Sequence, residues 1–237
     1  MKTLGIISAL QSEIGCLTDT KVTPMQIYPL ADNLCAILSG MGERNVRRAS
    51  ELLLNKNIEG LISFGTCAAL SENIKAGELI LADCVLTEND ERLASSESWR
   101  AAVMKYLNDH SISVHQGDNY SSSSVITSAA DKTALARRTG AIAVDMESAF
   151  VFKIAQNNKL PALSLKVVVD ESHLSIPSAI LESTDEYGQA NIPGLLMSVI
   201  RQPGLCADLM RLGGGFSQAR KTMLWVGRHA EQMFSKL

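Results

Sequence analysis

Residues 141–170 have the sequence AIAVDMESAFVFKIAQNNKLPALSLKVVVD, in which two apolar runs flank a segment of helical length. Ala141–Val144 and Ala162–Val169 are the candidate strands, and Ser148–Asn157 is the candidate helix. Strands that are buried on both faces of a parallel sheet have continuous apolar sequences of this kind. The stretch therefore predicts a β-α-β unit, which is typical of an α/β fold.

The same alternation continues toward the N-terminus. A helix is predicted over residues 43–57. Two segments that contain glycine, Ser39–Gly42 and Gly65–Ala69, follow predicted strands, and we interpret them as turns. The predicted strands in this part of the chain are Leu4–Ile7, Leu34–Leu38, Leu61–Phe64 and Glu78–Val85.

The pattern changes at about residue 175. Prolines interrupt it, and two helices are predicted over residues 205–212 and 218–234. Gly213–Gly215 lies between them, where glycine favours a break or the end of a helix. We expect a mostly helical appendage from about residue 175 on a single domain that spans residues 1–237.

Composition and charge exclude several classes of protein. The 237 residues are 46% hydrophobic, enough for a large core, and 22 basic against 25 acidic residues leave a net charge of −3. Without a net basic face, no nucleic acid partner is expected. The five cysteines and four histidines show neither CxxC nor HxxxH spacing, so neither a disulfide framework nor a metal site is predicted. The apolar run at Leu4–Ile7 is too short for a signal peptide or a membrane span, which predicts a cytoplasmic protein without a transmembrane segment.

Three carboxylates follow predicted strands, where ligands collect in open α/β sheets. Glu13 comes after the first strand, and Glu147 and Asp170 come after the two strands of the β-α-β unit. From position alone, the commoner explanations are an acid in the first turn of a helix for Glu147 and a cap or turn residue for Asp170. Gly40–Gly42, before a predicted helix, fits either a tight turn or an anion site.

Together these segments resemble the family of purine nucleoside phosphorylases and methylthioadenosine/S-adenosylhomocysteine nucleosidases. The specific part is the Met-Glu pair, followed at this distance by an aspartate at a strand end. The resemblance implies a single-domain, three-layer nucleoside-phosphorylase-like α/β fold with a mainly parallel central mixed sheet flanked by helices. It is carried by Leu4–Glu13, Ser39–Gly42, Phe64–Ala69, Ala143–Ala149 and Lys166–Asp170.

The resemblance also implies roles for individual residues. Asp170 would protonate or hydrogen-bond purine N7, so that the base does not leave as an anion; this is general acid catalysis by a carboxyl group whose pKa burial raises. Glu147 would bind the ribose hydroxyls, and Met146 would pack on the sugar. The other implied positions are Glu13 for orienting water, Val125 and Ile126 for the purine, and Gly42, Gly65 and Thr66 for a phosphate or water site.

Some positions depart from the family pattern. Ser63 stands where the phosphorylases commonly carry an arginine, and Val169 stands where a serine precedes the aspartate. Beyond Asp170 the chain resembles the hopanoid-associated phosphorylase branch, to which removal of adenine from an adenosyl lipid precursor is attributed. The segments that carry this second resemblance are Ile176–Pro177, Asp185–Gly188 and Gln202–Gly204.

The resemblance therefore implies an enzyme that cleaves the N-glycosidic bond of a purine nucleoside, with adenine as the base. Phosphorolysis of a hopanoid-linked adenosyl substrate leads, with inorganic phosphate as co-substrate and no cofactor. Hydrolysis by a methylthioadenosine/S-adenosylhomocysteine-type nucleosidase is the alternative, because Glu13 is present and an arginine at position 63 is absent. A non-catalytic nucleoside- or lipid-binding protein is an alternative of another class. A homo-oligomer is expected. Residues 193–200 and 205–212 either line a groove for an apolar 5′ substituent or pack on the sheet or on another subunit.

Overall fold

The computed structural model describes residues 3–177, 185–189, 205–235 and 237, with the backbone alone for residues 205–209. Residues 141–170 form the predicted β-α-β unit, made of β8 (Ala143–Asp145), α5 (Ser148–Asn157) and β9 (Ala162–Asp170). The other strands are β1 (Leu4–Ser8), β2 (Ile27–Ala31), β3 (Leu34–Leu38), β4 (Gly60–Ala69), β5 (Leu79–Leu86), β6 (Arg92–Ala94) and β7 (Val114–Ser121). The other helices are α1 (Gln11–Ile14), α2 (Glu43–Leu54), α3 (Glu97–Asp109), α4 (Ala129–Thr139) and α8 (Leu205–Phe234).

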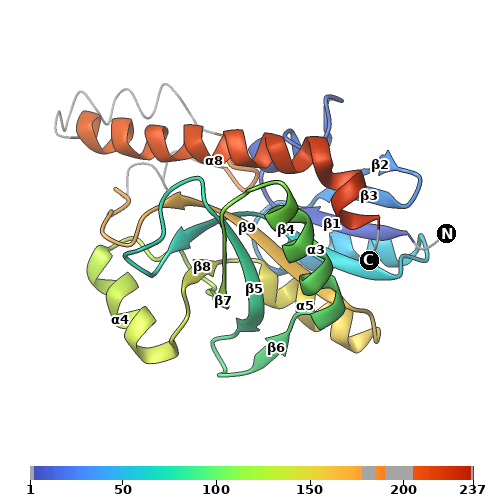
Figure 1. Cartoon of the computed structure of the whole chain (residues 1–237), viewed down its shortest axis with the longest axis horizontal. Coiled ribbons are helices and arrows are strands. Elements are labelled where there is room, and N and C mark those ends of the chain that lie inside the picture. Colours follow the sequence, from blue (N-terminus) through green and yellow to red (C-terminus); the bar gives the residue numbers. More distant parts are fainter. Residues whose placement is uncertain (1–2, 178–184, 190–204, 236) are drawn as a thin grey trace.

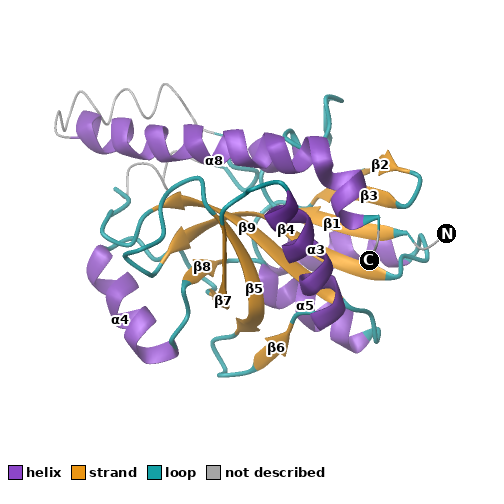
Figure 2. Ribbon diagram, in the orientation of Figure 1, coloured by secondary structure: helices purple, strands orange, loops and turns teal. Residues whose placement is uncertain are grey.

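The strands form one mixed sheet in the order β2-β3-β1-β4-β8-β7-β5-β6 (Figure 2). The pairings β1–β3, β1–β4, β4–β9, β5–β7 and β7–β8 are parallel. Strand β9 pairs with both β4 and β5, so β4, β9, β5, β7 and β8 close into a ring. This arrangement brings the ends of β4, β8 and β9 together.

Helices cover both faces of the sheet. On one face α3 and α8 pack on the strands, and in Figure 1 α8 runs along the top of the view, next to β9. On the other face α2 and α5 pack on β1, β3 and β4. The apolar side chains of the first layer include Trp99, Val103, Met223, Val226 and Phe234, and those of the second include Val46, Leu53, Val151 and Phe152. The expected three-layer α/β fold with a mixed sheet is confirmed.

The structure contradicts two expectations about glycine. Strand β4 continues through Gly65–Ala69, where a turn was predicted, and α8 continues through Gly213–Gly215, where a break was predicted. Gly65 and Gly215 each allow another part of the chain to approach the backbone closely. A Cβ atom at Gly65 would lie 2.6 Å from a carboxylate oxygen of Glu13, and one at Gly215 would overlap the carbonyl oxygen of Val169. Glycine is needed here because any side chain would separate the packed elements.

Some of the segments for which the sequence analysis states an expectation are not described by the structure. Residues 193–200 and Gln202–Gly204 lie outside the described residues. Within the described ranges, no helix combines the length and the apolar character needed to cross a bilayer.

Candidate active site

A cavity of about 240 Å³ opens where β1, β4, β8 and β9 end. Seven of the nine predicted site residues line it: Glu13, Thr66, Val125, Ile126, Met146, Glu147 and Asp170. Gly65 lies beneath it against Glu13, and Gly42 follows the lining residue Met41. The remaining lining residues are Ala9, Leu10, Met41, Cys67, Ala68, Ser124, Val144, Asp145, Val169 and Ile176.

Glu13 sits in α1 and is fixed from both ends of its carboxylate. Oε2 accepts hydrogen bonds from the backbone N–H groups of Ala9 and Leu10, at 3.1 and 3.0 Å. Oε1 accepts from the N–H and the hydroxyl of Thr66, at 2.7 and 2.8 Å. Burial raises the pKa of Glu13 above its usual value, although Lys166 and these hydrogen bonds act in the opposite direction. The Thr66 donors are therefore already paired with a carboxylate.

Lys166 neutralises part of the acidic cluster below the cavity. Its Nζ lies 2.8 Å from Oδ2 of Asp145, and both side chains are buried. Burial lowers the pKa of this ammonium, but the fields of Asp145, Glu147 and Glu13 outweigh burial, so the pKa lies above its usual value. Asp145 also accepts a short hydrogen bond from the hydroxyl of Ser148. A buried ammonium among carboxylates is held charged in this way.

Glu147 follows β8 and comes directly before α5. Its carboxyl group faces the cavity beside Met146. Burial, together with the negative charges of Asp145 and Glu13, raises its pKa to about 8, although the ammonium of Lys166 acts in the opposite direction. A carboxyl group with this pKa keeps its proton over most of the neutral range. A ribose diol would donate to this group best after that proton has left.

Asp170 ends β9 and is paired with a lysine that the sequence analysis did not single out. Nζ of Lys132, in α4, lies 2.5 Å from Oδ2 of Asp170, and neither side chain has appreciable exposure. Burial raises the pKa of Asp170 above its usual value, and the Lys132 ammonium acts against that rise. The net rise in the pKa of this buried carboxyl group is compatible with the general-acid role that the resemblance implies.

The glycine turn before α2 is covered by the segment 185–189. The backbone N–H of Met41 donates to the carbonyl of Glu186 at 2.8 Å. The amide of Asn45, in the first turn of α2, donates to the carboxylate of Glu186, also at 2.8 Å. Glu186 thus takes up two hydrogen-bond donors beside this helix N-terminus.

The two buried lysines of the site, Lys132 and Lys166, were not predicted from the sequence. A lysine in a helical pattern is usually exposed, which is the case that the sequence suggests for Lys132, and Lys166 entered only as part of the motif Lys166–Asp170. No periodic signal in the sequence distinguishes either from a surface lysine.

Ser63, at the position where the phosphorylases commonly carry an arginine, does not line the cavity. Its hydroxyl is hydrogen-bonded to the hydroxyl of Ser148, with 3.1 Å between the two oxygens. Among the described residues no group of three or more His, Cys, Asp or Glu side chains is arranged to hold a metal ion.

Comparison with known proteins agrees with the fold. The model of the phosphorylase superfamily matches residues 4–191. A 5′-methylthioadenosine/S-adenosylhomocysteine nucleosidase of Maridesulfovibrio salexigens is 26% identical over 228 residues, covering 84% of this chain and 99% of the relative. A DeoD-type purine nucleoside phosphorylase of Buchnera aphidicola is 27% identical over 130 residues, covering 51% of this chain and 55% of the relative.

The fold is shared with a solved structure as well. The 5′-methylthioadenosine/S-adenosylhomocysteine nucleosidase of Helicobacter pylori, crystallised with butyl-thio-DADMe-Immucillin-A, has a TM-score of 0.71 at 17% identity, covering 100% of this chain and 99% of that one. The chain belongs to the phosphorylase superfamily. The expectation of an enzyme is confirmed, because these relatives are nucleosidases and phosphorylases.

Proposed function

We propose that this chain hydrolyses the N-glycosidic bond of a purine nucleoside, with adenine as the base and water as the acceptor. The observation that carries the proposal is the pairing of Glu13 with both donors of Thr66, at the wall of a cavity that also contains Glu147 and Asp170. The names of the relatives support a purine nucleoside as the substrate class.

The choice of water over phosphate rests on charge. A phosphate site needs free N–H donors or cations. Here Thr66 donates to Glu13, and the donors of Met41 and Asn45 are used by Glu186. The lining of the cavity includes no lysine or arginine among the described residues. A phosphate dianion would therefore meet a buried carboxylate, whereas water can bond to it.

The reaction follows from three residues. As the C1′–N9 bond breaks, its electron pair passes to the purine, and the proton of the Asp170 carboxyl group moves to N7. The oxygen of water bonds to C1′, and its proton passes to the Glu13 carboxylate through the hydroxyl of Thr66, which donates to Oε1 of Glu13. The products are a free sugar and a neutral purine. Return of the proton from Glu13 to Asp170 through solvent restores the enzyme.

Glu147 and Met146 would hold the ribose, and Val125 with Ile126 would contact the purine. Both pairs line the cavity, and Val125 is 36% exposed. The ionised carboxylate of Glu147 accepts hydrogen bonds from two neighbouring hydroxyls, which makes it suitable for a diol.

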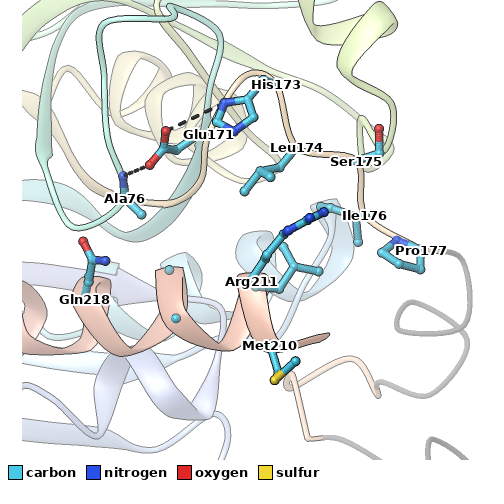
Figure 3. A pocket seen from close by; sticks show the side chains of 13 residues that line it. Ala76, Glu171, His173, Leu174, Ser175, Ile176, Pro177, Met210, Arg211 and Gln218 are labelled. Atoms are coloured by element: carbon cyan, nitrogen blue, oxygen red, sulfur yellow. Dashed lines mark hydrogen bonds and ion pairs between the residues drawn. The ribbon is translucent and has the colours of Figure 1, made fainter. Parts of the chain in front are cut away.

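A second candidate substrate carries a bulky apolar 5′ group, as in the adenosyl lipids of the hopanoid-associated branch. A groove of about 1020 Å³ adjoins the cavity, and Ile176 lines both. Figure 3 shows Leu174 and Ile176 on one side of this groove and Met210 of α8 on the other. The groove supports an extended 5′ substituent, and comparison of adenosine with 5′-alkylated adenosines of increasing chain length tests it. Turnover that rises with chain length supports the lipid-linked substrate.

Asp170→Asn tests the assignment of the general acid. Asparagine keeps the shape of the side chain but has no acidic proton to transfer, so kcat for adenine release is expected to fall by about a hundredfold or more, with little change in nucleoside affinity. The assay follows adenine release from 5′-methylthioadenosine. Asp118→Asn is the matched control, because Asp118 pairs with Arg92 away from the cavity. Unchanged turnover in Asp170→Asn would remove Asp170 from the mechanism.

A further inference from the structure

Lys132 is a fully buried cation that the proposed reaction does not yet use. It lies near the start of α4, whose N-terminal cap is Ser128. Its ammonium donates to Oδ2 of Asp170 at 2.5 Å and to the carbonyls of Glu171 and Leu174 at 3.1 and 2.9 Å. A lysine has three donors, and all three are satisfied here. A buried charge of this kind is costly unless it is paired, so the pairing with Asp170 holds the cation in place.

Asp170 shares the lining of the cavity with the carboxyl groups of Glu13, Asp145 and Glu147, but none of them is among the groups that shift its pKa most. The thiol of Cys67, in β4, is buried. Burial raises its pKa well above the usual value, and the negative charge of Asp170 is one of the smaller causes of that rise. The carboxylate of the neighbouring Glu171 points elsewhere, since it pairs with Lys75 at 3.0 Å and lies 3.8 Å from His173. On the described elements packed against Asp170, the ammonium of Lys132 is therefore the charge that acts on it most directly.

We propose that Lys132 is a positioning residue for the general acid: it fixes the Asp170 carboxyl group against N7 and stabilises the carboxylate that forms when the proton passes to the purine. This inference rests on the proposed function. In the reaction the proton leaves one carboxyl oxygen while Oδ2 stays hydrogen-bonded to the ammonium. The negative charge that develops on Asp170 then forms beside a preorganised cation in a buried site, where such stabilisation is strong.

The ion pair between Lys132 and Asp170 determines in which direction the pH profile of activity should move when the lysine is replaced. Activity requires a protonated Asp170, so activity is lost as pH rises through the pKa of that group. The ammonium lowers this pKa. Removing it leaves burial unopposed, so the pKa rises, the carboxyl group stays protonated to higher pH, and it becomes a weaker acid.

Lys132→Met tests the proposal, because methionine keeps most of the length of the side chain and removes its charge. We expect kcat at the pH optimum to fall by about tenfold, KM to change less than about threefold, and the alkaline limb of the kcat profile to move to higher pH by about one unit or more. Lys75→Met is the matched control, because it removes a cation that contacts Glu171 and not Asp170. The alkaline limb of the kcat profile of this variant should not move. In the Asp170→Asn background, Lys132→Met should add little further loss.

Two further measurements separate this role from a purely structural one. Lys132→Ala, assayed with and without ethylammonium, should regain part of its kcat when the amine is added, which also serves if Lys132→Met folds poorly. A lowered melting temperature with an unmoved alkaline limb, or losses that are additive with Asp170→Asn, would overturn the proposal. Absence of adenine release by the unaltered protein would overturn the proposed function and this inference with it, whereas normal release with an unmoved limb in both Lys132 variants would overturn this inference alone.

Discussion

At the scale of single residues, the carboxyl groups of Glu13, Glu147 and Asp170 line one cavity but lie in different environments. Glu13 accepts four hydrogen bonds, which favour its charged form, whereas Glu147 has a pKa of about 8. Asp170 is buried and paired with Lys132. Such divergent environments are how one site separates an acid from a base. The positions of these carboxylates after strands made them predictable from the sequence. The cation beside Asp170 was unpredictable, because its burial depends on where α4 lies relative to the end of β9 and the segment after it.

The pKa of Glu147 predicts a pH-dependent affinity. Its protonated form, dominant below about pH 8, can accept fewer hydrogen bonds from a ribose diol than the carboxylate. KM for 5′-methylthioadenosine should therefore fall as pH rises from 6 to 9, with the main change near pH 8. Glu147→Gln, which does not titrate, should show a higher KM without this slope. Steady-state kinetics across the pH range make the comparison, and a flat KM in the unaltered protein would contradict the assignment.

At the scale of elements, apolar runs predicted the strands and the helix of the β-α-β unit well. Leu34–Leu38 and Ser148–Asn157 have the predicted bounds. The predictions of a turn at Gly65–Ala69 and of a break at Gly213–Gly215 were wrong, because the sequence shows that glycine is present but not which element approaches it. Gly65 makes room for Glu13, which is 52 positions away in the chain (65 − 13), and Gly215 makes room for the end of β9. Tertiary contacts of this kind leave no local pattern.

The contrast between Gly215 and Gly213 gives a test of that explanation. Gly215→Ala places a Cβ against the carbonyl of Val169, so α8 must shift, and we expect a loss of about 1–3 kcal/mol in the free energy of unfolding. Gly213 is exposed in the same helix and a Cβ there would meet nothing within 4 Å. Gly213→Ala should instead stabilise by about 0.5–1 kcal/mol, because alanine favours the helix. Urea unfolding measures both; equal effects in the two variants would refute the close-approach role of Gly215.

At the scale of the whole molecule, the fold places acidic residues of the chain against hydrogen-bond donors in and beside the cavity. Glu13 comes from α1 and Glu186 from the segment 185–189, and they meet donors at the end of β4 and the start of α2. Phosphorolysis was the leading expectation because segments beyond Asp170 resemble the hopanoid-associated branch. The arrangement of donors supports hydrolysis instead. A homo-oligomer and one domain over residues 1–237 stay predictions.

The central claim is that water, not phosphate, accepts the sugar. The most direct measurement incubates the protein with 5′-methylthioadenosine, with and without inorganic phosphate, and identifies the sugar product by mass spectrometry. The proposed function predicts adenine and the free sugar at the same rate in both conditions. Adenine release that requires phosphate and yields a sugar 1-phosphate would contradict it, and would require a phosphate site that displaces Glu13 from Thr66.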